Sequence, residues 1–94
     1  MAAYWISRCH VTNQEDYSKY AELAGPVIES FGGRFLARGG EQVEVEGGTY
    51  ERTVLVEFDS FEEAKTCYHS PEYREAFKHQ EHAAERHVVI VEGV

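Results

Sequence analysis

The spacing of apolar positions changes from a strand-like to a helix-like period early in this 94-residue chain. Residues 3–11 (AYWISRCHV) are rich in aromatic and β-branched side chains and contain no Gly or Pro, which predicts a strand. Thr12 and Glu15 have the spacing of a capping box, so we expect a helix to begin there. This helix should kink or break at Pro26 and end at the glycine pair 32–33. Its predicted buried stripe is Tyr17, Tyr20, Ala24, Val27 and Phe31.

The rest of the chain predicts three more strands and two more helices. The strands are expected at 34–38 (RFLAR), 52–59 (RTVLVEFD) and 87–92 (HVVIVE). An acidic, glycine-rich connection joins the first two of these, and residues 42–46 within it are a candidate extension of the strand. Ser60 begins a second capping box, and Ser70 caps a further helix with Pro71 at its first position.

The resulting order is strand, helix, strand, strand, two helices, strand, which is the split βαβ or ferredoxin-like arrangement. We therefore expect a single α+β domain over residues 1–94, with a four-stranded antiparallel sheet and the helices on one face. A domain of this length buries only about two-thirds of the surface that its unfolded chain exposes. Self-association is one ordinary way to stabilise such a thin core.

Alternation along the predicted strands assigns their side chains to two faces of the sheet. The set assigned to the helix side is Trp5, Ser7, Cys9, Val11, Phe35, Ala37, Val54, Val56 and Phe58. The opposite set is Tyr4, Ile6, Arg8, His10, Leu36, Arg38, Leu55, Glu57, Ile90 and Glu92. A solvent-facing side of an antiparallel sheet is normally polar, so the apolar members of the second set predict an interface. We expect a homodimer through this face, a dimeric α/β barrel formed by sheet-to-sheet packing. The alternative is a monomer in which the loop 39–50 covers one edge of the face.

Charge and cysteine content narrow the partners. The chain has 17 Asp and Glu against 9 Lys and Arg, a net charge of −8. Nucleic acids and anionic membranes bind positive surfaces, so we expect neither as a partner. The N-terminus has no charged segment followed by an apolar run, and Cys9 and Cys67 form no CxxC pair. We expect a cytoplasmic protein with free thiols, a Cys9–Cys67 disulfide being the alternative.

The chain also resembles a known family in the order and spacing of short motifs along its whole length. They are Tyr4-Trp5-Ile6, Tyr17-x-x-Tyr20, Gly32-Gly33-Arg34-Phe35, Arg38-Gly39-Gly40, Val56-Glu57-Phe58, Ala64, Ser70-Pro71-Glu72-Tyr73 and Val91-Glu92-Gly93. The family is the bacterial domain of unknown function 1330, which is similar to the dimeric α/β-barrel superfamily of small monooxygenases, isomerases and heme-handling proteins. The resemblance implies a ferredoxin-like fold and a sheet-to-sheet dimer. It implies no activity and no catalytic residue.

Arg8, Arg38 and Glu57 share one sheet face in this assignment and form the leading candidate site. A guanidinium group beside a carboxylate in a partly dry cavity can clamp an anionic substrate, with Glu57 acting as a base. The set therefore predicts a small carboxylate or enol as ligand. The alternative is a structural ion pair that fixes the register of the dimer.

The histidines are secondary candidates. His10 ends the first strand and is a candidate acid or base at the mouth of the barrel, whereas the neighbouring Cys9 points to the other face and does not pair with it. His79 and His82 are three residues apart, a spacing that can hold a metal. The glutamate-bearing HExxH pattern is absent, so solvated surface histidines are the favoured interpretation.

We expect no cofactor and no resident metal. Two functions remain open. The first is the binding or conversion of a small organic molecule without a cofactor. The second is a non-enzymatic dimerising module that binds a metabolite or another partner without turnover. A fold shared by many activities does not decide between them.

Overall fold

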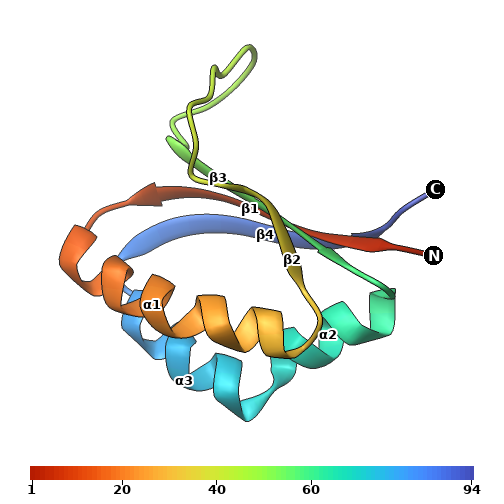
Figure 1. The fold of residues 1–94 in the computed structure, drawn as a ribbon. Helices are drawn as coiled ribbons and strands as arrows, with labels where there is room; N and C mark the ends of the chain where they lie inside the picture. The colour runs from red at the N-terminus through yellow and green to blue at the C-terminus, as the bar shows by residue number, and fades with distance from the viewer.

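Three helices cover one side of a four-stranded antiparallel sheet (Figure 1). The computed structural model describes every residue, 1–94. In chain order the elements are β1 (Ala3–Val11), α1 (Gln14–Ser30), β2 (Arg34–Arg38), β3 (Arg52–Phe58), α2 (Phe61–His69), α3 (Pro71–Gln80) and β4 (Ala84–Glu92). The strands lie in the order β2-β3-β1-β4, so the predicted α+β ferredoxin-like fold is confirmed. None of the helices has the length and apolar character needed to cross a membrane.

Side-chain caps fix where the three helices begin. The predicted caps Ser60 and Ser70 are confirmed, since each hydroxyl accepts a hydrogen bond of 3.1 Å from the amide three residues further on. The predicted start at Thr12 is wrong by one residue. Asn13 is the cap of α1, because its side-chain oxygen accepts from the amide three residues on at 3.1 Å. Thr12 still belongs to the extended chain, where its amide donates to the carbonyl of Ala83 at 2.8 Å.

Of the kink or break expected at Pro26, the break is wrong, because α1 continues to Ser30. Proline removes one hydrogen bond from the helix ladder. Buried residues lie on α1 both before the proline, at Ala24, and after it, at Ile28, so packing against the sheet holds the two halves in one helix.

Residues 39–51, which we call the arm, leave the sheet between β2 and β3 and protrude on the side opposite the helices (Figure 1). The candidate strand extension at 42–46 is therefore wrong, since these residues are exposed and form no ladder with the sheet. Three glutamates and three glycines lie between residues 40 and 48, a composition that disfavours strand pairing. The arm returns to the sheet at β3.

A β-bulge in β2 shifts its alternation from the predicted one. Phe35 keeps the predicted side, but Ala37 pairs with Leu55 and Arg38 pairs with Val54. Val54 faces the helices, so Arg38 does too, and Ala37 shares the open face with Leu55. The predictions that Arg38 lies on the open face and Ala37 on the helix side are therefore wrong.

The predicted assignment of β4 is corrected as well. Ile90 pairs with Trp5 and Glu92 with Ala3, so both lie on the helix side in register rather than on the open face. The large apolar residues on the open face include Tyr4, Ile6, Leu55, Val89 and Val91. Val89 is 53% exposed and Val91 is 46% exposed, so the second face is apolar as expected, although partly through other residues.

The core lies between the sheet and the helices, with Trp5 of β1 near its centre. The Trp5 ring stacks on Phe58 with 6.1 Å between centroids and meets Tyr73 edge-on at 5.0 Å. Tyr17 and Tyr20 of α1 are also buried. Three phenol hydroxyls are thus enclosed by protein, where each needs a hydrogen-bond partner.

Candidate functional site

A cavity lies between α1 and the helix-facing side of the sheet. Most of its wall is aromatic or aliphatic: Trp5, Tyr17, Tyr20, Ala21, Ala24, Gly25, Ile28, Phe35, Val54 and Val56. The other residues of the wall are Ser7, Arg38, Arg52 and Arg86. The cavity has a volume of about 30 Å³ and is partly open to solvent. A ligand larger than water therefore requires the flexible arginine side chains to move.

The register of the sheet places the polar residues in two adjacent rows beneath α1. Ser7 and Arg38 share one row, since both pair with the same residue of β3. Arg52 and Arg86 share the next row, since they pair with Cys9 from its two sides. Neighbouring strands are about 5 Å apart, so the backbones of Arg52 and Arg86 are about 10 Å apart with β1 between them. Positive charge therefore borders the cavity from both sides of β1.

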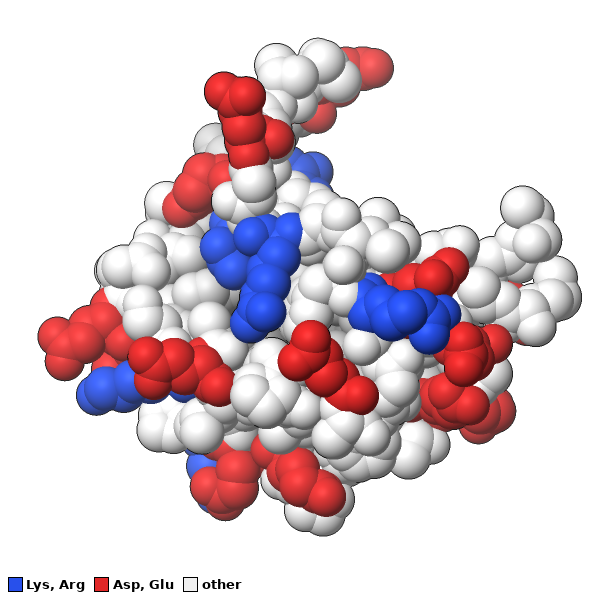
Figure 2. Space-filling view, in the orientation of Figure 1, with Lys and Arg blue, Asp and Glu red and all other residues white.

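The three arginines of the cavity have no carboxylate partner. The basic residues that do lie within 4.0 Å of an Asp or Glu oxygen are Arg8, Lys19, Arg34, Lys65 and Lys78. Arg38, Arg52 and Arg86 form no such pair, although the chain carries a net charge of −8. The other unpaired arginine, Arg74, donates instead to the carbonyl of Tyr68 at 2.9 and 3.1 Å. Figure 2 shows Lys and Arg side chains gathered below the acidic arm, with further acidic side chains around them.

Two glycines make room for the guanidinium groups of Arg38 and Arg52. A Cβ atom at Gly25 of α1 would lie 2.5 Å from Nη2 of Arg38, which is stacked 4.2 Å from the ring centroid of Phe35. Gly39 has a φ of 69°, and a Cβ atom there would overlap Nη1 of Arg52. Arg52 lies over the ring of Tyr17, with Cζ 5.5 Å from the ring centroid, and Nε of Arg52 is buried without a partner. Arg38 forms no ion pair, so both guanidinium groups keep donors for a ligand.

Ser7 adds a buried hydroxyl to the cavity. It is 3% exposed, and its Oγ has no hydrogen-bond partner. A buried hydroxyl without a partner costs about 1–3 kcal/mol, and native proteins usually avoid it. Because Ser7 lies in the wall of the cavity, a polar group of a ligand would remove this cost.

Arg86 of β4 bridges two buried tyrosines. It donates to Oη of Tyr20 at 3.0 Å and to Oη of Tyr73 at 3.2 Å, and the two oxygens are 2.8 Å apart. Burial opposes the charge on Arg86, but the two phenol oxygens more than offset it, so its pKa is raised. Burial also raises the pKa of Tyr73 far above its ordinary value. Arg86 is therefore a cation, and Tyr73 a neutral phenol, near neutral pH.

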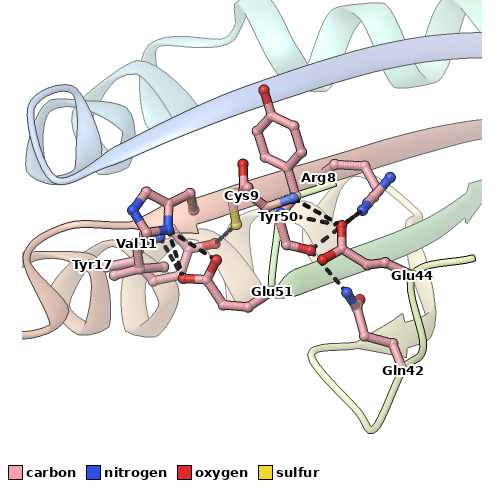
Figure 3. Close-up of polar contacts among 10 residues, drawn as sticks. Arg8, Cys9, Val11, Tyr17, Gln42, Glu44, Tyr50 and Glu51 are labelled. Carbon is pink, nitrogen blue, oxygen red and sulfur yellow. Dashed lines mark hydrogen bonds and ion pairs between the residues drawn. The ribbon is translucent and has the colours of Figure 1, made fainter. Parts of the chain in front are cut away.

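Tyr17 borders the cavity, whereas Cys9 and Cys67 do not. Oη of Tyr17 lies 3.5 Å from Sγ of Cys9 (Figure 3), and burial, assisted by this contact, raises the pKa of Tyr17 to about 12. Burial, together with the charge of Glu72, raises the pKa of Cys67 to about 12. Both cysteines are free and buried, so neither thiol has the exposed thiolate character of a nucleophile.

The structure does not bring together the predicted set of Arg8, Arg38 and Glu57. Arg8 lies on the open face and bonds Oε2 of Glu44 in the arm at 2.6 Å (Figure 3). Glu57 accepts from Arg34 at 3.1 Å. Arg38 faces the helices because of the bulge, although it also borders, with Arg8, a wide groove beneath the arm. Arg8 and Glu57 share the open face as predicted, since Arg8 has the alternation of Tyr4 and Tyr4 pairs with Glu57. The shared face is wrong only for Arg38, and a role of these residues in ligand binding stays a prediction.

His10 contacts the last residue of the arm, Glu51. Its Nδ1 lies 3.1 Å from Oε2 of Glu51, whose other oxygen accepts from the amide of Val11 at 3.0 Å (Figure 3). The backbone amides of Glu51 and Val11, with a further contribution from His10, hold the pKa of the Glu51 carboxyl below its ordinary value. The predicted acid or base role of His10 stays a prediction.

The predicted metal candidates lie apart from the cavity. Helix α3 ends at Gln80, so His79 is helical while His82 lies in the turn that follows, exposed and 3.5 Å from Glu81. The structure contains no group of three His, Cys, Asp or Glu side chains that could hold a metal ion.

Of the polar residues that border the cavity, the sequence analysis singled out only Arg38. Ser7 was assigned to the helix side but not considered as a site residue, and Arg52 has the same alternation as Val54. An arginine at a helix-facing position of a strand, in a chain this acidic, is the signal that points to the site. Arg86 precedes the predicted last strand and had no assigned face, so alternation alone does not place it.

The topology, the one-sided helix layer and the cavity beneath α1 define a ferredoxin-like α+β protein. Residues 2–94 match the family described as Domain of unknown function (DUF1330). The chain belongs to this family, as its motifs indicated.

Solved structures share this fold. The RPA0582 protein of unknown function from Rhodopseudomonas palustris is 20% identical with a TM-score of 0.82, covering 99% of this chain and 82% of its own. SnoaB, a cofactor-independent oxygenase from Streptomyces nogalater, is 5% identical with a TM-score of 0.69, covering 99% and 93%. A dimeric protein of unknown function and ferredoxin-like fold from Bacteroides fragilis is 17% identical with a TM-score of 0.55, covering 98% and 96%. No curated protein matches the chain.

Proposed function

We propose that this protein binds a small organic anion in the cavity beneath α1. The observation that carries the proposal is that three arginines without carboxylate partners border one largely apolar cavity in a chain of net charge −8. A cation beside apolar walls is screened less than one in water, so it attracts an anion more strongly. Guanidinium groups also bind carboxylates through paired hydrogen bonds.

The ligand class follows from the rest of the wall. The rings of Trp5, Tyr17 and Phe35 offer an apolar surface, which suits a ligand with an aromatic or other unsaturated body. Arg38 and Arg52 carry unused donors for its carboxylate. The ligand is thus a small aromatic or enolic carboxylate, and this proposal replaces the Arg8–Glu57 face with the helix-facing arginines.

Conversion of the ligand without a cofactor is the second candidate function. Its support is the oxygenase SnoaB, which shares the fold, together with the buried tyrosine pair that Arg86 polarises beside the cavity. A shared fold by itself does not assign an activity. Product analysis after incubation with any tightly bound compound decides between binding and turnover.

We also propose that two copies associate through their open sheet faces. An exposed apolar face of a sheet is typical of an interface, and the Bacteroides fragilis protein of the same fold is described as dimeric. The arm rises on this side of the sheet (Figure 1) and would flank the partner. The free thiols of Cys9 and Cys67 suit a reducing, cytoplasmic compartment, and the acidic charge argues against nucleic acid as a partner.

The test of the binding site is calorimetric titration of the protein with benzoate, cinnamate and phenylpyruvate. Arg52→Met removes one charge from the cavity while keeping an apolar stem, and we expect it to weaken binding by about tenfold or more. Lys19→Met is the control, because it makes the same change of net charge on the exposed face of α1. An absence of saturable binding by the unaltered protein, or equal affinities of the two variants, would refute the proposal.

A further inference from the structure

We propose that Ser7 and Tyr20, together with Arg86, form a second recognition point in the cavity, which selects carboxylates that also carry a hydroxyaryl or enol oxygen. This inference rests on the proposed anion site and specifies its ligand. Arg38 and Arg52 bind the carboxylate from the β2–β3 side, and the second oxygen lies toward β1 and β4.

The hydroxyls of Tyr20 and Tyr73 have one proton more than the hydrogen bond between them uses. Tyr20 and Tyr73 share one hydrogen bond, which uses one of their two hydroxyl protons, and both oxygens accept from Arg86. The tyrosine that accepts in the shared bond therefore keeps a proton for which the protein supplies no acceptor.

The burial of the two side chains indicates which tyrosine keeps the unused proton. Tyr73 is 0% exposed and does not border the cavity, so a free proton there would be buried without an acceptor. Tyr20 is in the cavity wall. The arrangement of lower free energy has Tyr73 donating to Tyr20, because it directs the remaining proton of Tyr20 toward the cavity.

Ser7 supplies a second unused hydroxyl in the same region. Its Oγ is buried without a partner, and Ser7 lies on β1, between Arg38 of the outer strand and the β4 strand that carries Arg86. Two neutral donors beside a cation match an oxygen that carries partial or full negative charge. A phenol or enol oxygen meets this requirement, whereas an aromatic ring with a carboxylate alone does not.

The experiment compares the affinities of benzoate with those of 3- and 4-hydroxybenzoate, which add only the second oxygen at two positions. We expect the better hydroxybenzoate to bind about tenfold more tightly than benzoate to the unaltered protein. Ser7→Ala and Tyr20→Phe should each bring the ratio of hydroxybenzoate affinity to benzoate affinity close to one, and this ratio is the readout whatever each variant does to benzoate affinity itself.

Tyr73→Phe is the matched control. It removes the other hydroxyl bonded to Arg86 but leaves Tyr20 able to donate into the cavity, so the preference should persist. Equal binding of benzoate and both hydroxybenzoates, with Arg52 still required, overturns this inference and leaves the anion site standing. Equal loss of preference in the Tyr20 and Tyr73 variants overturns it too. Binding of none of the three compounds overturns both proposals.

Discussion

At the scale of single residues, the absence of a side chain at Gly25 decides where the guanidinium group of Arg38 lies. A Cβ atom at this position would lie 2.5 Å from Nη2 of Arg38, and the far end of an arginine can move aside at low cost. Gly25 is buried within α1, where glycine is unfavourable compared with alanine. Glycine at position 25 therefore leaves room for the guanidinium group of Arg38, although glycine is a poor helix former.

Gly25→Ala should separate stability from ligand binding. Alanine has a higher helix propensity than glycine, but its Cβ would crowd the ring of Pro26, so the free energy of unfolding should change little. Displacement of the Arg38 guanidinium group should weaken benzoate binding about three- to tenfold. Urea unfolding and calorimetry measure the two effects. Gly40→Ala is the control, since nothing lies within 4 Å of its added Cβ, and a loss of stability in the Gly25 variant would contradict the expectation.

At the scale of elements, the arm is held to the sheet at few points. Glu44 is the main one, because it accepts from Nη2 of Arg8 at 2.6 Å and from the amides of Thr49 and Tyr50 (Figure 3). These backbone hydrogen bonds, with the nearby charge of Arg8, hold the pKa of the Glu44 carboxyl below its ordinary value. The carboxylate therefore organises both the turn of the arm and its attachment to β1.

Glu44→Gln should loosen the arm without unfolding the domain. The amide keeps one acceptor oxygen but loses the charge that binds Arg8, so limited proteolysis within residues 39–51 should become several-fold faster. Far-ultraviolet circular dichroism should stay unchanged. Glu46→Gln is the control, because Glu46 lies in the same exposed segment and makes no side-chain hydrogen bond or ion pair. Similar cleavage rates for the two variants would show that Glu44 does not hold the arm.

Elements whose cause is local were predictable from the sequence. Ser60 and Ser70 cap their helices through hydroxyls that accept from amides three residues further on. The spacing of residues in the sequence predicts this geometry. The start at Asn13 was missed because Thr12 and Asn13 are both good caps. The continuation of α1 through Pro26 was missed because packing against the sheet outweighs the loss of one hydrogen bond. No local sequence pattern shows this packing.

The site was less predictable because it depends on register. One extra residue in β2 places Arg38 on the helix side of the sheet, and no sequence pattern predicts this bulge. Arg86 and Arg52 lie on the two sides of Cys9 only because β3 and β4 both pair with β1. The prediction of an arginine-based site for a small carboxylate or enol survives as a proposal, with different residues around it.

At the scale of the whole molecule, the two sides of the sheet have different roles. One side is covered by helices and encloses the cavity, and the other presents Val89, Val91 and Leu55 to solvent or to a second copy. Burying a large aliphatic side chain contributes about 1.5–3 kcal/mol, before the cost of association is subtracted. Several such residues per copy support the proposed dimer.

Leu55→Glu should convert the protein to a monomer at micromolar concentration. The two-fold axis would bring unpaired carboxylates into an apolar interface, which costs several kcal/mol. Light scattering gives the mass directly. Leu23→Glu is the control, since Leu23 is 47% exposed on α1, away from the sheet, and should leave the mass unchanged. A monomeric unaltered protein would refute the association, whereas the cavity beneath α1 lies within one copy and does not depend on it.

The bulge in β2 also bears on how related chains diverge. Deleting Leu36, the residue between Phe35 and Ala37, would restore regular alternation, yet Phe35, Ala37 and Arg38 would keep their partners on β3. Arg38 would therefore stay beside the cavity. Related chains in which β2 is one residue shorter at this point should still place an arginine there, so the loss of one codon leaves the charge of the ligand site unchanged.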